Sequence, residues 1–172
     1  KTNNFRESAF YYGLAQRFDP FNIESSIGIG KSLSELENVE KGVEHVQNAL
    51  ANSPHKAALL NGIAEIYARK GDYANAIKFA DNALTVDPNY ALAFKTRGDA
   101  LNSQDKIKEA LDSYLTYCNL APLDPQGRIE RYKIMLKKQD FKGGKEELQK
   151  VVDNYPRYPG VYFMFSELYR ES

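Results

Sequence analysis

The sequence predicts an all-α solenoid, in which antiparallel helix pairs are stacked with a period of 34 residues. The first observation behind this prediction is a proline at one fixed interval, at Pro20, Pro54, Pro88, Pro122 and Pro156. The second is two columns of small residues with the same period, namely Gly30, Ala64, Gly98 and Ser166, and Ser8, Gly42, Ala76, Ala110 and Gly144. A helix breaker in constant phase marks the end of one copied unit, and small residues let two helix backbones approach closely.

Residues 57–90 show how each helix pair is expected to form. Apolar residues recur there at intervals of three and four, the spacing of one helix face. They form two runs, Leu59, Leu60, Ile63, Ile66 and Tyr67, then Tyr73, Ile77, Ala80, Ala83 and Leu84. Gly71 between the runs suits the left-handed turn after a helix C-terminus, and Pro88 ends the second helix because it has no backbone N–H. Since such connections are short, the two helices must be antiparallel neighbours.

The period carries these boundaries along the chain. With an uncertainty of about two to four residues at each end, the expected helices are 5–18, 24–36, 39–52, 57–70, 73–86, 91–103, 107–120, 126–138, 141–154 and 160–171. Residues 125–158 depart most from the pattern. Arg128 and Arg131 stand where 57–90 has apolar residues, and Tyr132 occupies a small-residue column. We therefore expect the first helix of this repeat to be rotated or locally irregular.

The residues between 71 and 98 resemble the tetratricopeptide repeat. Those that carry the resemblance are Gly71-Asp72-Tyr73, Ala76, Ala83-Leu84, Asp87-Pro88-Asn89, Ala91 and Gly98. The resemblance covers 1–172 as one solenoid, divided into a second helix of a partial repeat at 1–22, complete repeats at 23–56, 57–90, 91–124 and 125–158, and a first helix of a truncated or capping repeat at 159–172. It implies a right-handed superhelix whose first helices line a concave groove. It also implies a non-enzymatic scaffold or adaptor that binds a peptide or protein segment in that groove.

The resemblance further implies which side chains face the groove. The ligand-binding residues expected from it are Lys31, Asn61, Glu65, Arg69, Lys95, Asp99, Asn102, Lys133 and Lys137. Some domains of this family hold the acidic C-terminal tails of chaperones with a clamp of Lys, Asn and Arg. Counted from Lys95, the clamp positions here hold Asp99 and Glu130, and counted from Asn61 they hold Glu65 and Glu130. These carboxylates would repel a carboxylate ligand, so a chaperone-tail clamp is excluded.

The composition narrows the classes of partner. The chain has 23 basic and 23 acidic residues and is 42% hydrophobic, which is typical of a soluble helical protein. Nucleic acid is not an expected partner because the chain lacks a basic excess, and direct membrane insertion is not expected because no run of 18 apolar residues exists. A cytoplasmic location is favoured, with a bacterial periplasmic or envelope-associated one as the alternative. Because the chain begins and ends within a repeat, we expect a piece of a longer repeat protein.

No catalytic, metal or cofactor site is expected. Residues 28–32 (Gly-Ile-Gly-Lys-Ser) resemble the end of a phosphate-binding loop, but Ser25 stands where that motif needs its first glycine, and no strand precedes it. His45 and His55 lack the accompanying ligands that a metal site requires, and no nucleophile with an oriented base can be named. Cys118 falls in a column of apolar residues and is expected to be a buried thiol. The chain is therefore not expected to be an enzyme.

Two surfaces leave alternatives open. Residues 128–145 carry seven cationic side chains against two acidic ones, which indicates either a solvated helix pair or a patch for an acidic peptide or phosphate. In the last helix, Tyr162, Phe165 and Tyr169 recur at the spacing of a buried stripe, which favours self-association into a homo-oligomer if no other helix covers it. Besides groove binding, we therefore keep a self-associating structural solenoid and a docking or regulatory arm of a larger multidomain protein.

Overall fold

The computed structural model describes the backbone of residues 2–172 and the side chains of residues 4–172, and it confirms the all-α solenoid. The described residues form ten helices: α1 (Thr2–Phe18), α2 (Ile23–Leu36), α3 (Val39–Asn52), α4 (Lys56–Arg69), α5 (Tyr73–Val86), α6 (Ala91–Ser103), α7 (Ile107–Leu120), α8 (Gln126–Lys137), α9 (Phe141–Asn154) and α10 (Gly160–Glu171). The largest difference from the expected boundaries is at the start of α1, which begins at Thr2 rather than at residue 5.

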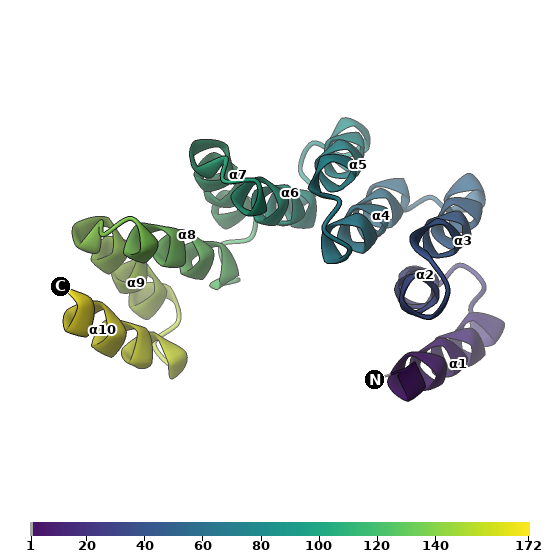
Figure 1. Ribbon diagram of the computed structural model, residues 1–172, viewed down its shortest axis with the longest axis horizontal. Coiled ribbons are helices and arrows are strands. Elements are labelled where there is room, and N and C mark those ends of the chain that lie inside the picture. Colours follow the sequence, from purple (N-terminus) through teal and green to yellow (C-terminus); the bar gives the residue numbers. More distant parts are fainter. Residues whose placement is uncertain (1) are drawn as a thin grey trace.

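The helices follow one another along an arch, with the two chain ends at opposite extremes of it (Figure 1). Each helix packs against the next in the chain, and α4 also contacts both α2 and α6. These contacts place the first helices of successive pairs side by side. The result is a right-handed solenoid whose first helices supply a continuous row of side chains from α2 to α6.

The turn inside each helix pair repeats in conformation more faithfully than in sequence. Gly71, with φ of 81°, follows α4, and the equivalent positions after α6 and α8 hold Asp105 (φ 58°) and Gln139 (φ 59°). In the first of these turns the N–H of Asp72 donates to the carbonyl of Tyr67 at 3.0 Å, which closes the helix end. Glycine adopts this left-handed conformation at the lowest cost, so the two later turns are more strained than the turn at Gly71.

The small-residue columns lie at the helix-pair contacts, as predicted. Ala76 and Ala110 are fully buried. A Cβ added at Gly30 would lie 2.9 Å from the carbonyl oxygen of Gly42, so this contact between α2 and α3 admits no larger residue. Ser166 is the exception, because it is exposed on α10, where no further helix of the described residues packs against it.

The expectation of a rotated or irregular first helix in 125–158 is wrong. α8 is a continuous helix from Gln126 to Lys137. Its buried face matches that of α4 position by position, with Gly127, Ile129, Tyr132 and Ile134 buried where Leu59, Asn61, Ala64 and Ile66 are buried. The large Tyr132 is accommodated because its hydroxyl donates to the carbonyl of Met164 at 3.0 Å, across to α10.

Candidate functional site

Two adjoining pockets cross the first helices of three successive pairs. The first has a volume of about 430 Å³ and is lined by Tyr12, Ile23, Glu24, Ile27, Gly28, Lys31, Ala58, Asn61, Glu65, Tyr90 and Leu92. The second has a volume of about 410 Å³ and is lined by Glu65, Ala68, Arg69, Leu92, Lys95, Thr96 and Asp99. Because Glu65 and Leu92 line both pockets, they form one depression, which we call the groove.

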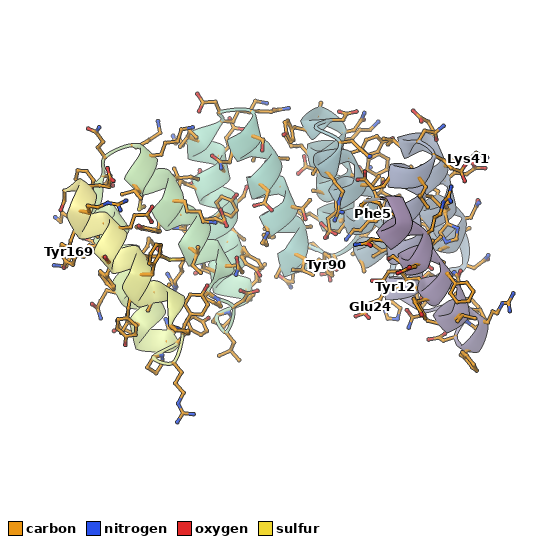
Figure 2. The ribbon with its side chains drawn as sticks, turned by 60° about the horizontal axis from the view of Figure 1, so that its bottom comes forward. Phe5, Tyr12, Glu24, Lys41, Tyr90 and Tyr169 are labelled. Carbon is orange, nitrogen blue, oxygen red and sulfur yellow. The ribbon has the colours of Figure 1, made fainter. Side chains whose placement is uncertain are left out.

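The wide end of the groove is bounded by aromatic rings. Tyr12 comes from α1 and Tyr90 from the turn before α6, and Figure 2 shows them gathered with Glu24 on one side of the molecule. The ring of Tyr12 lies directly over Gly28, where an added Cβ would come within 2.6 Å of it. Leu92 is 45% exposed between the two pockets and offers an apolar surface to a ligand. This end of the groove therefore combines apolar walls with a polar margin.

The carboxylate of Glu65 is held by two neighbours. It forms an ion pair with Lys31, one repeat earlier, and accepts a hydrogen bond of 2.9 Å from the amide of Asn61 on its own helix. Burial, and then the charge of Glu65, raises the pKa of Tyr90 across the pocket. Glu65 is therefore a fixed negative charge at the centre of the groove, with its orientation set before any ligand arrives.

The second pocket has a similar fixed pair. The ammonium of Lys95 lies 2.9 Å from the carboxylate of Asp99, and the hydroxyl of Tyr114 donates to the other oxygen of Asp99 at 2.7 Å. Burial lowers the pKa of Lys95, but its contacts with Asp99 more than offset this and leave the pKa above the ordinary value. Burial, and then Asp99, raises the pKa of Tyr114. Lys95 and Tyr114 therefore both keep their protons at neutral pH.

Two charged residues at the margin of the groove are not engaged in this way. Glu24 and Arg69 are exposed, and among the residues that the structure describes neither has an oppositely charged group within 4.0 Å. Glu24 lines the first pocket and Arg69 the second. The groove thus presents a negative group in one pocket and a positive group in the other to an incoming segment.

The structure brings together six of the nine expected ligand-binding residues. These six line the groove: Lys31, Asn61, Glu65, Arg69, Lys95 and Asp99. Lys133 and Lys137 line a separate pocket of about 330 Å³ with Phe141 and Glu167, and Asn102 lines neither the groove nor that pocket.

Asn61 corrects one part of the expectation. Polar groove residues were expected to have no packing role, but Asn61 is 2% exposed and holds Glu65, and its Oδ1 atom has no hydrogen-bond partner. Tyr12 and Tyr90 were missed, since one belongs to the preceding second helix and the other to an inter-repeat turn. A sequence signal for Tyr12 was the glycine at 28, whose missing side chain leaves room for a ring.

The basic stretch 128–145 is not a uniform patch. Arg128 and Arg131 contact the carboxylate of Glu147 at 3.3 and 3.2 Å, and Glu147 is 3% exposed. Lys150 contacts the same carboxylate at 3.3 Å. Two of the seven cations are therefore part of an internal ion-pair cluster between α8 and α9, and they are not available to an acidic ligand.

The other residues singled out in the sequence lie in ordinary helical positions. Residues 28–32 lie inside α2, with Lys31 turned to Glu65, so the described backbone forms no phosphate-binding loop there. Cys118 is a buried thiol, as predicted, and burial raises its pKa. Over residues 2–172, no group of three metal-ligating side chains comes together, and no helix is both long and apolar enough to cross a membrane.

The C-terminal aromatic residues differ in burial. Tyr162 and Tyr169 are 58% and 60% exposed, whereas Phe165 packs partly against the cluster that contains Tyr132 and Leu168. The rings of Phe165 and Tyr169 stack at a centroid distance of 6.2 Å. The ammonium of Lys145 lies 5.7 Å from the centre of the Tyr169 ring. One side of α10 is therefore an exposed aromatic surface.

Comparison with known protein families identifies the repeat. Residues 27–91 match the family model of the tetratricopeptide repeat. Among curated proteins, protein FlbA of Caulobacter vibrioides is 29% identical over 101 residues, which cover 59% of this chain. The matched residues are 16% of the length of FlbA, so the chain spans a small part of that relative.

Solved structures extend the likeness over nearly the whole chain. TTC0263, a tetratricopeptide-repeat protein of Thermus thermophilus, is 16% identical and has a TM-score of 0.76, with 98% of this chain and 92% of that one covered. PilW, a type IV pilus biogenesis factor, is 16% identical with a TM-score of 0.70, covering 90% of this chain and 72% of its own. At these identities the likeness shows the fold alone. Together with the family match at 27–91, it shows that the chain is a tetratricopeptide-repeat protein with the fold of a right-handed α-solenoid.

Proposed function

We propose that the protein is a non-enzymatic scaffold or adaptor that binds a peptide or protein segment in the groove. The observation that carries this proposal is the pair of adjoining pockets across α2, α4 and α6, with apolar walls and fixed charges. An extended or helical segment fits such a surface, because apolar side chains anchor it while polar groups set its register.

The charges of the groove favour a protein segment over nucleic acid. Lys31 and Lys95 are neutralised by Glu65 and Asp99, so the row of cations that a phosphate backbone requires is absent from these two pockets. A segment with an apolar anchor, a cationic residue toward Glu24 and an acidic residue toward Arg69 complements what is exposed. Lys133, Lys137 and Asn102 remain predicted ligand contacts outside the groove.

The role of the whole protein is part of the same proposal. PilW takes part in pilus biogenesis, and FlbA is far longer than the segment it shares with this chain. We infer that the solenoid acts within a larger assembly, either as an adaptor between partners or as a docking arm of a multidomain protein. It needs no cofactor in this role.

Charge reversal in the groove tests the proposal. Partners are isolated by affinity capture and identified by mass spectrometry, and the affinity of the purified partner is then measured by calorimetry. The double variant Arg69→Glu, Lys95→Glu should weaken binding by about 2 kcal/mol, because hot-spot residues concentrate at the centre of an interface. Circular dichroism should show an unchanged helical content.

The matched control reverses two charges outside the groove. Lys78→Glu with Lys108→Glu changes exposed lysines on α5 and α7, neither of which lines the groove. This control should bind as the parent does. Equal affinities for the parent and the groove variant would move the binding site to the second helices or the turns.

The exposed aromatic side of α10 favours a second candidate function, self-association into a homo-oligomer. Tyr162 and Tyr169 are more than half exposed and, with Phe165, offer a surface suited to aromatic contacts. Replacing both tyrosines by lysine should abolish concentration-dependent association in sedimentation experiments while the earlier repeats stay folded. The variant Phe10→Lys, Tyr11→Lys removes two exposed aromatic side chains from α1 and should leave association unchanged. A parent chain that stays monomeric at high concentration contradicts this candidate.

A further inference from the structure

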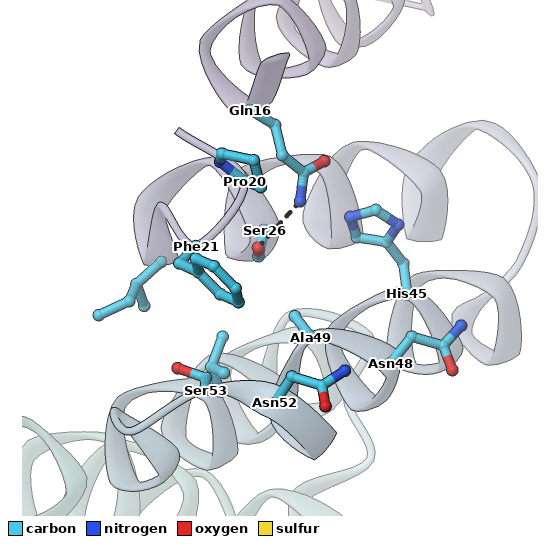
Figure 3. Close-up of a pocket in the computed structure, with 11 residues that line it drawn as sticks. Gln16, Pro20, Phe21, Ser26, His45, Asn48, Ala49, Asn52 and Ser53 are labelled. Carbon is cyan, nitrogen blue, oxygen red and sulfur yellow. Dashed lines mark hydrogen bonds between the residues drawn. The ribbon is translucent and has the colours of Figure 1, made fainter. Parts of the chain in front are cut away.

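A third pocket lies apart from the groove, between the turn after α1 and the helix α3. It has a volume of about 250 Å³. Its walls are Gln16, Pro20, Phe21, Ile23, Ser26, His45, Asn48, Ala49, Asn52, Ser53 and Leu59 (Figure 3). None of these side chains is an aspartate, glutamate, lysine or arginine. A charged ligand would find no counter-ion in this pocket, so the pocket suits an uncharged one.

The repeat explains why space is left here and not elsewhere. Gln16, Ser26 and His45 occupy three positions whose equivalents one repeat later, 34 residues on, are Leu50, Leu60 and Phe79. Those three apolar side chains are partly buried and pack against apolar clusters. Replacing a leucine by Ser26 removes most of a side chain from this position. The same change at three columns at once makes the first repeat polar and hollow where the next one is filled.

The other repeats also fill these positions. One period after Leu50, Leu60 and Phe79, the equivalent residues are Leu84, Phe94 and Ser113, and the hydroxyl of Ser113 is engaged at 2.9 Å by Arg97. The last set includes Arg128 and Glu147, which form an ion pair. The first repeat is therefore the one that leaves both space and an unused polar atom at these positions.

That unused atom belongs to His45. Its Nε2 atom is buried, and it has no hydrogen-bond partner among the described residues. By contrast, the amide of Gln16 donates to the hydroxyl of Ser26 at 3.2 Å, which in turn donates to the carbonyl of Asn22. Burial lowers the pKa of His45, so its imidazole is neutral at neutral pH. A buried imidazole nitrogen without a partner is costly unless a ligand supplies one.

The two walls of the pocket differ in chemistry, and the difference defines the ligand. Pro20, Phe21, Ile23 and Leu59 offer apolar surface against which a flat ring packs. His45, Asn48 and Asn52 offer hydrogen-bonding groups on α3 (Figure 3). A hydroxyl both donates and accepts, so it pairs with either tautomer of the neutral imidazole. The volume accommodates a single ring.

We propose that this pocket binds an uncharged phenol group, supplied either by a tyrosine side chain of a partner protein or by a free phenolic compound. The ring lies against Phe21 and Pro20, and the hydroxyl pairs with the Nε2 atom of His45. This site is independent of the groove, because the two share Ile23 alone.

The test is a titration followed by amide chemical shifts in NMR spectra. With p-cresol as the probe, saturable shifts should appear at residues 16–26 and 45–53, with a dissociation constant on the order of 1 mM for so small a ligand. Toluene, which has the same shape without the hydroxyl, should bind about fivefold more weakly because it lacks the hydrogen bond. N-acetyl-tyrosinamide distinguishes the sources. Binding as tight as that of p-cresol points to a tyrosine of a partner, and binding of p-cresol alone points to a free phenol.

Variants that copy the next repeat provide the decisive comparison. Ser26→Leu with His45→Phe should fill the pocket, abolish the shifts and leave the melting temperature equal or higher, since these residues pack in the second repeat. Ser103→Leu with His55→Phe makes the same chemical changes at exposed positions and should bind p-cresol as the parent does. His45→Phe alone should reduce p-cresol binding to the toluene level. No saturable shifts in the parent, or shifts that persist in the filled variant, would overturn the proposal.

Discussion

Replacing Glu147 by alanine should destabilise the solenoid by about 3 kcal/mol, because it leaves two partly buried guanidinium groups without their counter-ion. Arg128 and Arg131 have side chains that are 20% and 14% exposed, and both direct their charge at this carboxylate. Their partial exposure lets water reach them and keeps the expected cost at the lower end of the range for a broken buried ion pair. Urea unfolding followed by circular dichroism measures the change.

A triple variant distinguishes lost charge pairing from lost packing. Arg128→Leu, Arg131→Ile and Glu147→Phe together install the residues found at the equivalent positions of 57–90. Because a buried ion pair is often no more stabilising than well-packed apolar side chains, this variant should be about as stable as the parent. A Glu147→Ala variant within about 0.5 kcal/mol of the parent, the scatter of ordinary surface substitutions, would contradict the assignment.

The second large effect is expected from Ala110→Glu. Ala110 is fully buried between α6 and α7, in a cluster with Leu101, Tyr114 and Ile134. A glutamate there would either bury an unpaired charge or force the helices apart, at a cost of about 4 kcal/mol or more. Thermal unfolding should show a large loss of stability, and the loss should spread to the neighbouring repeats because each repeat is stabilised by the next.

Lys108→Glu on the same helix is the control for Ala110→Glu. Lys108 is exposed, so its charge reversal should change stability by no more than about 0.5 kcal/mol. If Ala110→Glu instead melts within about two degrees of the parent, the small-residue column does not mark a tight helix contact.

The repeat period made the fold predictable because it sets which residues are neighbours. Residues 34 apart occupy the same place in successive units, so a small residue such as Ala76 or Ala110 could be assigned to a helix contact without coordinates. The ion pair between Lys31 and Glu65 spans this same interval and could have been predicted by searching for opposite charges one period apart. Periodicity therefore reaches beyond the core to part of the groove.

The features that escaped prediction depend on side chains from different columns. The contact of Arg131 with Glu147 spans 16 residues and joins two helices of one repeat, so no column reveals it. Tyr12 and Tyr90 enter the groove from a second helix and from a turn, outside the row of first-helix positions. Asn61 looked like a solvated groove residue, yet its orientation toward Glu65 depends on the packing of α2 against α4.

Site-specific photo-crosslinking tests the central claim, that the groove holds the partner. A photoreactive amino acid is placed at Leu92, which lines both pockets of the groove, or at Val86, which lies at the end of α5 and lines neither pocket. These two apolar residues are 45% and 51% exposed, so they give probes of matched accessibility. The probe at Leu92 should crosslink the partner that affinity capture identifies, and the probe at Val86 should not. Crosslinking from Val86 and none from Leu92 would contradict binding in the groove.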